Sequence, residues 1–312
     1  MSFEIIVKPI FDFEEIIIRH PQNGIQITIS TKGGLLNSWI VNNEKTNHEF
    51  IDGNNFSNGW DSFENNGFKS GKMSPFSCRL QNGKYEHFGQ EFTIDKFYLG
   101  AHALHGFIYD AVYSIESTTN NELEATVILK HEYLGTDKGY PFPYTIQLVW
   151  TISNENKVSV QTTIINNSTQ AIPMMDGWHP YFKLEDTIEH SILQFNNIGK
   201  IEYDNELLPT GKIQSDTVFD NGKMLSGIHL DSCYILDPLH PYCFLESAKF
   251  KLIVHPEINY PYLQIYTPDN RKSVAIENLS GVPNCFNNKM GVHYVKPHDL
   301  FILKTSYQII IR

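Results

Sequence analysis

The alternation of apolar and polar residues along the chain predicts a protein built from β-strands. Period-two or β-branched runs of strand length recur from one end of the sequence to the other. They cover residues 25–30, 122–130, 144–152, 157–165, 250–255, 262–266 and 301–311. No segment of a dozen residues repeats its apolar positions at helical spacing, and strands do not alternate with helices as in a parallel α/β sheet. We therefore predict an all-β fold.

Dipeptides typical of tight turns separate many of these runs, because Asn-Gly and Asp-Gly tolerate positive φ angles. They are Asn23-Gly24, Asp52-Gly53, Asn58-Gly59, Asn66-Gly67, Asn82-Gly83 and Asn221-Gly222. The pattern continues without a linker or a low-complexity break, so we expect residues 1–312 to form one large antiparallel β-sandwich domain. Two less regular segments, residues 54–71 and 186–231, flank candidate polar residues and are expected to be functional loops.

Composition narrows the classes of function. The chain has 312 residues, enough to bury a large core without disulfides or metal, and its 24 basic and 35 acidic residues give a net charge of -11. This charge disfavours nucleic acid and anionic membranes as partners. Residues 1–9 lack the pattern of an export signal and no apolar stretch approaches ~20 residues, so we expect a cytoplasmic protein. Its cysteines are scattered, which predicts free thiols and no metal site: Cys78, Cys233, Cys243 and Cys285.

The segment from Asp176 to Leu184 contains the strongest candidate for chemistry. His179 lies between Trp178 and the run Pro180-Tyr181-Phe182. An imidazole oriented by such packing can titrate near neutral pH, and the aromatic rings offer flat apolar faces to a sugar. A histidine beside aromatic residues also fits a satisfied core position, so the neighbouring candidates decide between the two interpretations.

Two further candidates precede His179 in the chain. Arg79 is expected in a strand before a hairpin turn at Asn82-Gly83, where it either binds a ligand or pairs with a carboxylate on the surface. His102 and His105 are three residues apart, a spacing that fits a metal only on a helix, and Gly106 disfavours a helix. His105 better fits a loop histidine that donates to a ligand oxygen.

Two acidic candidates follow. Asp231 immediately precedes a short apolar strand, where it caps a turn or binds a ligand. Glu277 is expected at the end of an apolar strand that leads into Gly281. A carboxylate there is costly unless it is paired or functional.

Taken in chain order, these motifs resemble the aldose 1-epimerase (mutarotase) family. The resemblance extends from about Gly33 to the strand after Pro297. It rests on Cys78-Arg79-Leu80 with Gly83 and Tyr85, on Leu104-His105-Gly106, on His179-Pro180-Tyr181-Phe182, on Pro209-Thr210-Gly211, on Asp231, and on Glu277 with Pro283-Asn284. Each motif is short, but their shared order along nearly the whole chain is specific.

The resemblance implies an antiparallel β-sandwich with a sugar site in a cleft across one sheet. It assigns Glu277 as the general base at the anomeric hydroxyl O1 and His179 as the general acid at the ring oxygen. Arg79, His105 and Asp231 match residues that bind the sugar hydroxyls. Opening a cyclic hemiacetal moves only protons, so a carboxyl and an imidazole suffice and no cofactor is expected. The resemblance leaves monomer and homodimer both open.

Three positions depart from the usual pattern of the family. Cys78 and His102 each replace an Asn, and Gly177-Trp178 replaces a lead rich in Thr and Asn. We expect these changes to affect the residues that face the sugar. Three alternatives to a free-sugar mutarotase stay open: a mutarotase of hexose 6-phosphates, to which Lys72, Lys84 or Arg271 contributes a cation; a carbohydrate-binding protein without turnover; and a structural role.

Overall fold

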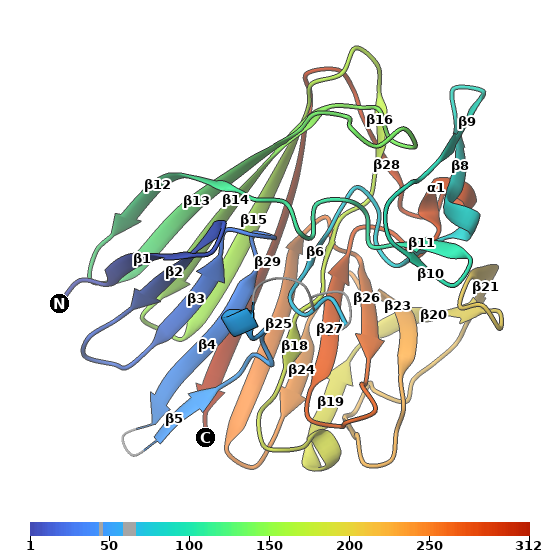
Figure 1. Cartoon of the computed structure of the whole chain (residues 1–312). Coiled ribbons are helices and arrows are strands. Elements are labelled where there is room, and N and C mark those ends of the chain that lie inside the picture. The colour runs from blue at the N-terminus through green and yellow to red at the C-terminus, as the bar shows by residue number, and fades with distance from the viewer. Residues whose placement is uncertain (44–45, 59–66) are drawn as a thin grey trace.

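The computed structural model describes residues 1–43, 46–58 and 67–312. Within these residues, three antiparallel sheets hold most of the strands (Figure 1). The largest sheet has the order β12 (Ser114–Asn120), β13 (Glu124–Tyr133), β14 (Tyr144–Ser153), β15 (Lys157–Asn166), β29 (Leu300–Ile311), β25 (Phe250–Ile258), β24 (Cys243–Glu246), β19 (Ile192–Phe195) and β22 (Lys223–Met224). Its long central strands form because buried and more exposed positions alternate along β13, β14 and β15, as the sequence predicts.

The other two sheets are shorter. One contains β1 (Glu4–Ile10), β2 (Phe13–Arg19), β3 (Gln26–Ser30), β4 (Leu36–Asn43) and β5 (Thr46–Glu49). The other has the order β21 (Pro209–Gln214), β20 (Asn197–Tyr203), β23 (Asp231–Leu236), β26 (Tyr262–Tyr266), β27 (Val274–Leu279), β17 (Gly177–Trp178) and β6 (Lys72–Met73), and β18 (Tyr181–Phe182) also pairs with β27. We call the latter the site sheet, because it carries three of the five candidate residues.

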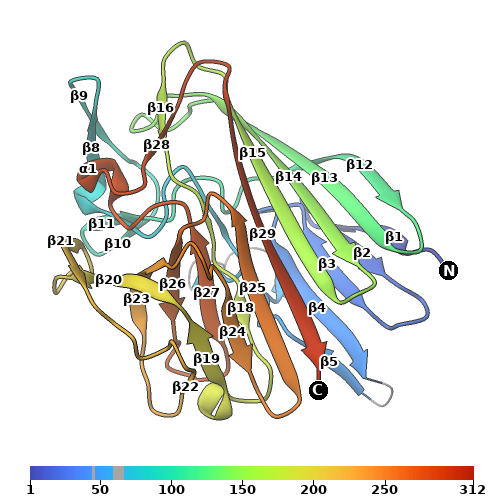
Figure 2. The same cartoon turned by 180° about the vertical axis from the view of Figure 1, so that it is seen from behind.

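Both shorter sheets pack against the long sheet, which backs the whole molecule (Figure 1, Figure 2). The five-stranded sheet lies against the half that contains β12 to β15, where the indole Nε1 of Trp150 donates to the carbonyl of Gly34 at 2.9 Å. The site sheet lies against the other half, where the rings of Phe195 and Tyr234 are 4.8 Å apart. One buried apolar cluster includes residues of all three sheets. The prediction of an antiparallel β-sandwich is confirmed.

Small elements complete the described part of the chain. They are the sheet of β10 (Tyr98–Leu99), β11 (His102–Leu104) and β7 (Arg79–Leu80), the pairs β8 (Lys84–His87) with β9 (Gln90–Thr93) and β16 (Ile172–Met174) with β28 (His293–Val295), the short helix α1 (Cys285–Asn288), and 3-10 turns at Phe56–Asn58, Gln81–Gly83 and Ile188–His190. None of the four cysteines forms a disulfide, as predicted. No helix among the described residues has the length and apolar character needed to cross a membrane.

The turn predictions have mixed outcomes. Gly24 and Gly222 have positive φ, and the first joins the paired strands β2 and β3. Gly53 has ordinary backbone angles, and its missing side chain instead permits close approach, since a Cβ there would lie 1.9 Å from the carbonyl oxygen of Asn37. The turns predicted at Asn58-Gly59 and Asn66-Gly67, like part of the loop 54–71, lie outside the described residues at 59–66.

The turn at Asn82-Gly83 corrects the expectation of a hairpin after Arg79. Both residues have positive φ, but the strands on either side do not pair with each other. β7 pairs with β11, and β8 pairs with β9. Arg79 therefore lies in a sheet with the strand that leads to His105, a contact between distant segments that local turn signals do not specify.

Candidate active site

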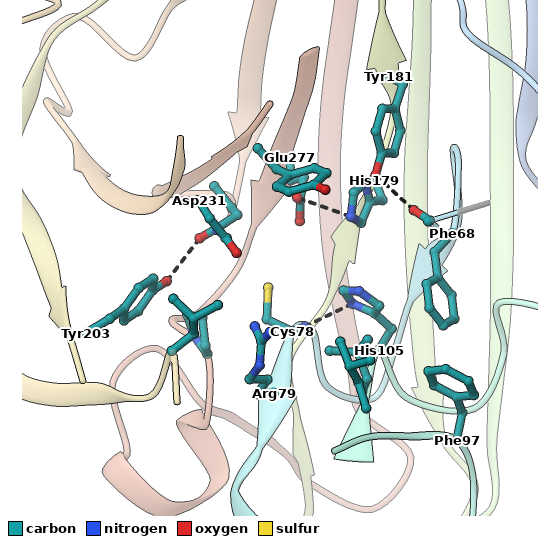
Figure 3. Close-up of a pocket in the computed structure, with 17 residues that line it drawn as sticks. Phe68, Cys78, Arg79, Phe97, His105, His179, Tyr181, Tyr203, Asp231 and Glu277 are labelled. Atoms are coloured by element: carbon teal, nitrogen blue, oxygen red, sulfur yellow. Dashed lines mark hydrogen bonds and ion pairs between the residues drawn. The ribbon is translucent and has the colours of Figure 1, made fainter. Parts of the chain in front are cut away.

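The structure brings all five candidate residues to one cavity of about 340 Å³ (Figure 3). Arg79 comes from β7 and His105 follows β11, whereas His179 connects β17 to β18, Asp231 begins β23 and Glu277 lies inside β27. The cavity therefore opens between the site sheet and the small sheet of β7, β10 and β11. Its size is within the range of small-molecule sites.

His179 and Glu277 form the closest pair of titratable groups in the cavity. The Nε2 atom of His179 is 3.3 Å from Oε1 of Glu277, and both side chains are buried (Figure 3). The other polar atoms of the pair, Nδ1 of His179 and Oε2 of Glu277, have no hydrogen-bond partner among the described residues. Because buried polar atoms are nearly always paired in native proteins, two unpartnered atoms in one pair mark the pair as a candidate functional site.

The backbone on both sides fixes the position of His179. Its N–H donates to the carbonyl of Gly71 at 3.1 Å, and its carbonyl accepts from the N–H of Ser70 at 2.8 Å. The imidazole stacks on Tyr181 with ring centroids 4.9 Å apart and planes 8° apart. The hydroxyl of Tyr181 donates to the carbonyl of Gly67 at 3.0 Å. The ring is therefore oriented before any ligand enters.

Glu277 lies two residues before the end of β27, not at the strand end as the sequence predicts. Every residue of this strand is buried, and Glu277 is directly opposite Gln264 in β26. Burial raises the pKa of Glu277 well above its ordinary range, and the nearby charge of Asp231 raises this pKa further. Glu277 therefore keeps its proton to higher pH than an exposed carboxyl does.

Burial has the opposite effect on the imidazole, because desolvation disfavours its protonated form. It lowers the pKa of His179 to about 4. Burial therefore favours the neutral form of both groups, a protonated carboxyl and an unprotonated imidazole. Two groups this close titrate as a pair, so the number of protons on the pair is the quantity that matters.

His105 occupies a strained turn that aims its ring at the cavity. It has φ 62° and is followed by Gly106 at φ 76°, where a Cβ would lie 2.2 Å from the carbonyl oxygen of Ser74. The backbone N–H of Cys78 donates to Nδ1 of His105 at 3.2 Å, and burial lowers the pKa of His105 well below its usual value. A neutral imidazole that accepts at Nδ1 carries its proton on Nε2, so His105 is a donor at that atom.

Asp231 is oriented by two residues that the sequence interpretation missed. Nε2 of Gln264 donates to Oδ1 of Asp231 at 2.6 Å, and the hydroxyl of Tyr203 donates to Oε1 of Gln264 at 3.0 Å. Burial raises the pKa of Asp231, opposed by the charge of Arg79 and the hydrogen bond from Gln264. One signal for Gln264 exists in the sequence: it is the sole amide in the otherwise apolar or aromatic run Tyr-Leu-Gln-Ile-Tyr of residues 262–266.

Among the described residues that line the cavity, Arg79 is the one arginine, and there is no lysine. Its guanidinium makes no hydrogen bond or ion pair with any other residue in the described part of the chain, and its charge acts on Asp231, His105 and Cys78. A guanidinium held beside a cavity without a protein partner can donate to ligand oxygens. The surface ion pair that the sequence left open for Arg79 is therefore absent among the described residues.

Two of the three departures from the family pattern, at Trp178 and His102, lie outside the cavity. Trp178 is buried beside Trp150, with ring centroids 5.2 Å apart, and does not line the cavity, whereas Tyr181 does. His102 also lies outside the cavity, where its Nδ1 accepts from the N–H of Asn82 at 3.1 Å and its Nε2 is 3.4 Å from Glu206. Of the three departures, only Cys78 lines the cavity.

The comparisons with known proteins agree with this architecture. The sequence profile of the family described as Aldose 1-epimerase matches residues 14–296. The crystal structure of a galactose mutarotase-like protein from Clostridium acetobutylicum superposes with a TM-score of 0.85 over 100% of this chain and 99% of its own, at 17% identity. Galactose 1-epimerase from Lactobacillus acidophilus gives 0.83 over the same shares, also at 17% identity.

A curated relative is similar in sequence as well. The uncharacterized protein YihR of Escherichia coli is 25% identical over 250 residues, which are 73% of this chain and 76% of the relative. The structural neighbours establish the shared fold, and the profile match covers most of the chain. The protein belongs to the aldose 1-epimerase family, whose members are isomerases that act on sugars.

Proposed function

We propose that this protein is a mutarotase that interconverts the α and β anomers of a free aldose. Glu277 is the general base at O1, and His179 is the general acid at the ring oxygen. The observation that carries the proposal is the buried pair itself, 3.3 Å apart in the cavity, with Nδ1 and Oε2 unpartnered among the described residues. O1 and the ring oxygen share the anomeric carbon, so two groups this close can reach both oxygens at once.

The reaction moves one proton at each oxygen. Glu277 removes the proton of O1 while His179 gives a proton to the ring oxygen, and the bond between C1 and the ring oxygen breaks to leave an open-chain aldehyde. Rotation about the C1–C2 bond presents the other face of the carbonyl. Attack by the former ring oxygen, with both proton transfers reversed, closes the ring as the other anomer. Atoms and charges balance without any further reactant.

The protonation of the empty site sets a requirement on substrate binding. Burial favours the proton of the pair on Glu277, because it raises the pKa of this carboxyl and lowers the pKa of His179 to about 4. For Glu277 to act as the base, this proton moves across the 3.3 Å gap to His179 as the sugar binds. Sugar hydroxyls that donate to the carboxylate favour this form of the pair, since hydrogen bonds to a charged group stabilise the charge.

The remaining polar residues bind the sugar in this proposal. His105 donates from Nε2, Arg79 donates from its guanidinium, and Asp231 accepts at Oδ2 while Gln264 holds its Oδ1. Donors and an acceptor placed around a ring with hydroxyls of both kinds fix its orientation. Together they hold the anomeric carbon against the pair.

The cations suggested for a sugar phosphate are engaged elsewhere. Lys72 is fully buried against Asp176, Lys84 pairs with Glu91 at 2.9 Å, and Arg271 pairs with Glu189 at 2.7 Å. None of these three side chains lines the cavity. This arrangement favours an unphosphorylated sugar.

Polarimetry of freshly dissolved α-aldoses tests the proposed function. We expect the protein to accelerate the approach to anomeric equilibrium for at least one common aldose. We expect Glu277→Gln, which keeps the size of the side chain, to remove most of that acceleration while the fold is retained by circular dichroism. A glutamine variant as fast as the wild type, or no acceleration of any aldose, would refute the proposal.

A further inference from the structure

One side of the cavity is apolar and belongs to a separate hydrophobic cluster. Phe68 and Leu104, both lining residues, are members of a buried cluster distinct from the main core, and Phe97 packs against that cluster. Three polar candidates, His179, Asp231 and Glu277, belong to the site sheet. These three apolar residues come from the segment before β6 and from the β10–β11 region, which also positions His105. We call Phe68, Phe97 and Leu104 the apolar wall.

The apolar wall is held in place by edge-to-face contacts. The ring centroid of Phe68 lies 5.2 Å from that of Phe97, 4.7 Å from that of His105 and 5.0 Å from that of Tyr109, with interplanar angles of 70°, 63° and 89°. Such pairs are favourable beyond the area that they bury. The backbone carbonyl of Phe97 also accepts from the N–H of Leu104 at 3.0 Å, which ties two wall residues together. The wall is a preformed surface that a ligand meets without rearrangement.

The proposed acid and base determine which part of the sugar meets this wall. With O1 at Glu277 and the ring oxygen at His179, the anomeric carbon lies on the Glu277 side. The ring oxygen is bonded to C1 and C5, so C5 and its substituent extend past His179 on the opposite side. Figure 3 shows Glu277 and Phe68 on opposite sides of His179, with Phe97 further along. In this orientation the C5 substituent is directed to the side of the cavity that holds His105 and the apolar wall.

Among the described residues, the polar groups next to Phe68 in sequence and on Tyr181 already have protein partners. Lys69, adjacent to Phe68 in sequence, pairs with Asp52 at 2.7 Å, and the hydroxyl of Tyr181 is already donated to Gly67. Phe68, Phe97 and Leu104 have no side-chain hydrogen-bonding group. A hydroxyl whose neighbours are these three side chains, away from the Nε2 donor of His105, loses water without replacement, whereas a methyl group gains apolar contact.

We propose that the preferred substrates are neutral sugars with an apolar C5 substituent, the 6-deoxyhexoses, and that Phe68, Phe97 and Leu104 set this preference. The inference rests on the proposed function, because the position of the acid and base orients the sugar. It goes further in naming the substrate class and the residues that select it.

Matched sugar pairs test the preference. D-fucose is compared with D-galactose, and 6-deoxy-D-glucose with D-glucose, so that each pair differs only in the oxygen at C6. We expect kcat/KM for mutarotation to favour the deoxy sugar by about tenfold in the pair with the accepted ring stereochemistry. Equal values, or a preference for the hydroxymethyl sugar in both pairs, would overturn the inference and leave the mutarotase function standing.

Saturation-transfer NMR on the wild-type protein measures how the sugar is bound, independently of whether the protein catalyses mutarotation. With D-fucose and 6-deoxy-D-glucose as probes, the C6 methyl protons are expected to receive more saturation than the anomeric proton, because they contact the aromatic wall. Absence of mutarotation with this methyl signal intact would refute the proposed function alone. A methyl signal weaker than the anomeric signal, or no saturation of either probe, would overturn the inference.

A pair of variants tests the role of the wall directly. Phe97→Gln places a hydrogen-bonding group on the wall, and partial exposure of Phe97 makes the change tolerable for the fold. We expect it to abolish the tenfold preference. Leu207→Gln makes a comparable change in another lining residue, in the turn between β20 and β21, and should leave the preference intact. Equal effects of the two variants would contradict a selective wall.

Discussion

Nε2 of His179 lies 3.3 Å from Oε1 of Glu277, and burial displaces the pKa values of the two groups in opposite directions. An isolated histidine would exchange its proton near neutral pH, whereas burial favours the neutral imidazole of His179 down to about pH 4. Five segments distant in sequence position the pair and its neighbours. The chemical behaviour of the site follows from these opposite pKa shifts.

The pH dependence of kcat/KM should report the number of protons on the pair. Below about pH 4 both groups are protonated and no base is present, so the rate falls with decreasing pH. The rate falls again at high pH, as Glu277 loses its proton at its raised pKa and no acid remains. Mutarotation measured from pH 3 to 10, with the uncatalysed rate subtracted, checks both limbs. An acid limb centred near pH 6.5 would show that His179 titrates as an ordinary histidine.

Gln264→Leu should weaken sugar binding more than it slows the chemistry. The change removes the donor to Asp231 Oδ1, raises the pKa of Asp231 further and leaves the hydroxyl of Tyr203 without its acceptor. A hydrogen bond to a charged group is worth about 1.5–3 kcal/mol, so KM should rise about tenfold or more. Steady-state kinetics check the prediction. A fall in kcat with KM unchanged would place Gln264 in the chemical step instead.

Gly106→Ala should destabilise the protein by about 2 kcal/mol or more, because a strained φ of 76° is combined with a collision with the carbonyl of Ser74. Gly100→Ala is a matched control: φ there is 65°, but the added Cβ meets no atom within 4 Å. We expect about 1 kcal/mol for the control. Urea denaturation of both variants measures the difference, and equal losses would mean that close approach to Ser74 is unimportant.

The buried ion pair of Lys72 and Asp176 should contribute to the stability of the folded protein. Both side chains are fully buried, Lys72 Nζ also donates to Thr162 at 3.1 Å, and burial lowers the pKa of Lys72 to about 8. Lys72→Met alone leaves a buried carboxylate and should cost about 3–5 kcal/mol. Lys72→Met combined with Asp176→Leu should recover part of this loss. Denaturation midpoints of the three proteins check this, and a double variant less stable than the single one would contradict it.

Local sequence patterns predicted the strands well, since alternation depends on neighbouring residues alone. The predicted run at residues 262–266 is β26 itself, and the runs at 144–152 and 157–165 differ from β14 and β15 by one residue. The hairpin after Arg79 was wrong because β7 pairs with β11, a contact that closes a longer loop. No turn dipeptide specifies such a pairing.

Sequence alone predicted those site residues whose charged side chain stands within an apolar run, such as Glu277. Gln264 was missed because an uncharged amide attracts less notice, although it bridges Tyr203 to Asp231. Trp178 was misplaced because adjacent residues of an extended segment point to opposite faces, so it enters the core while His179 enters the cavity. The protonation of the pair depends on burial, which the sequence does not state.

The most direct test of the central claim is a double-mutant cycle on the pair. Mutarotation rates are measured for the wild type, Glu277→Gln, His179→Asn and the combined variant, on the same aldose at pH 7. If the two residues act as one unit, each single variant loses about 10²- to 10⁴-fold and the combined variant falls less than tenfold below the slower single variant. Losses that multiply across the two positions, or a single variant with wild-type activity, would contradict the account.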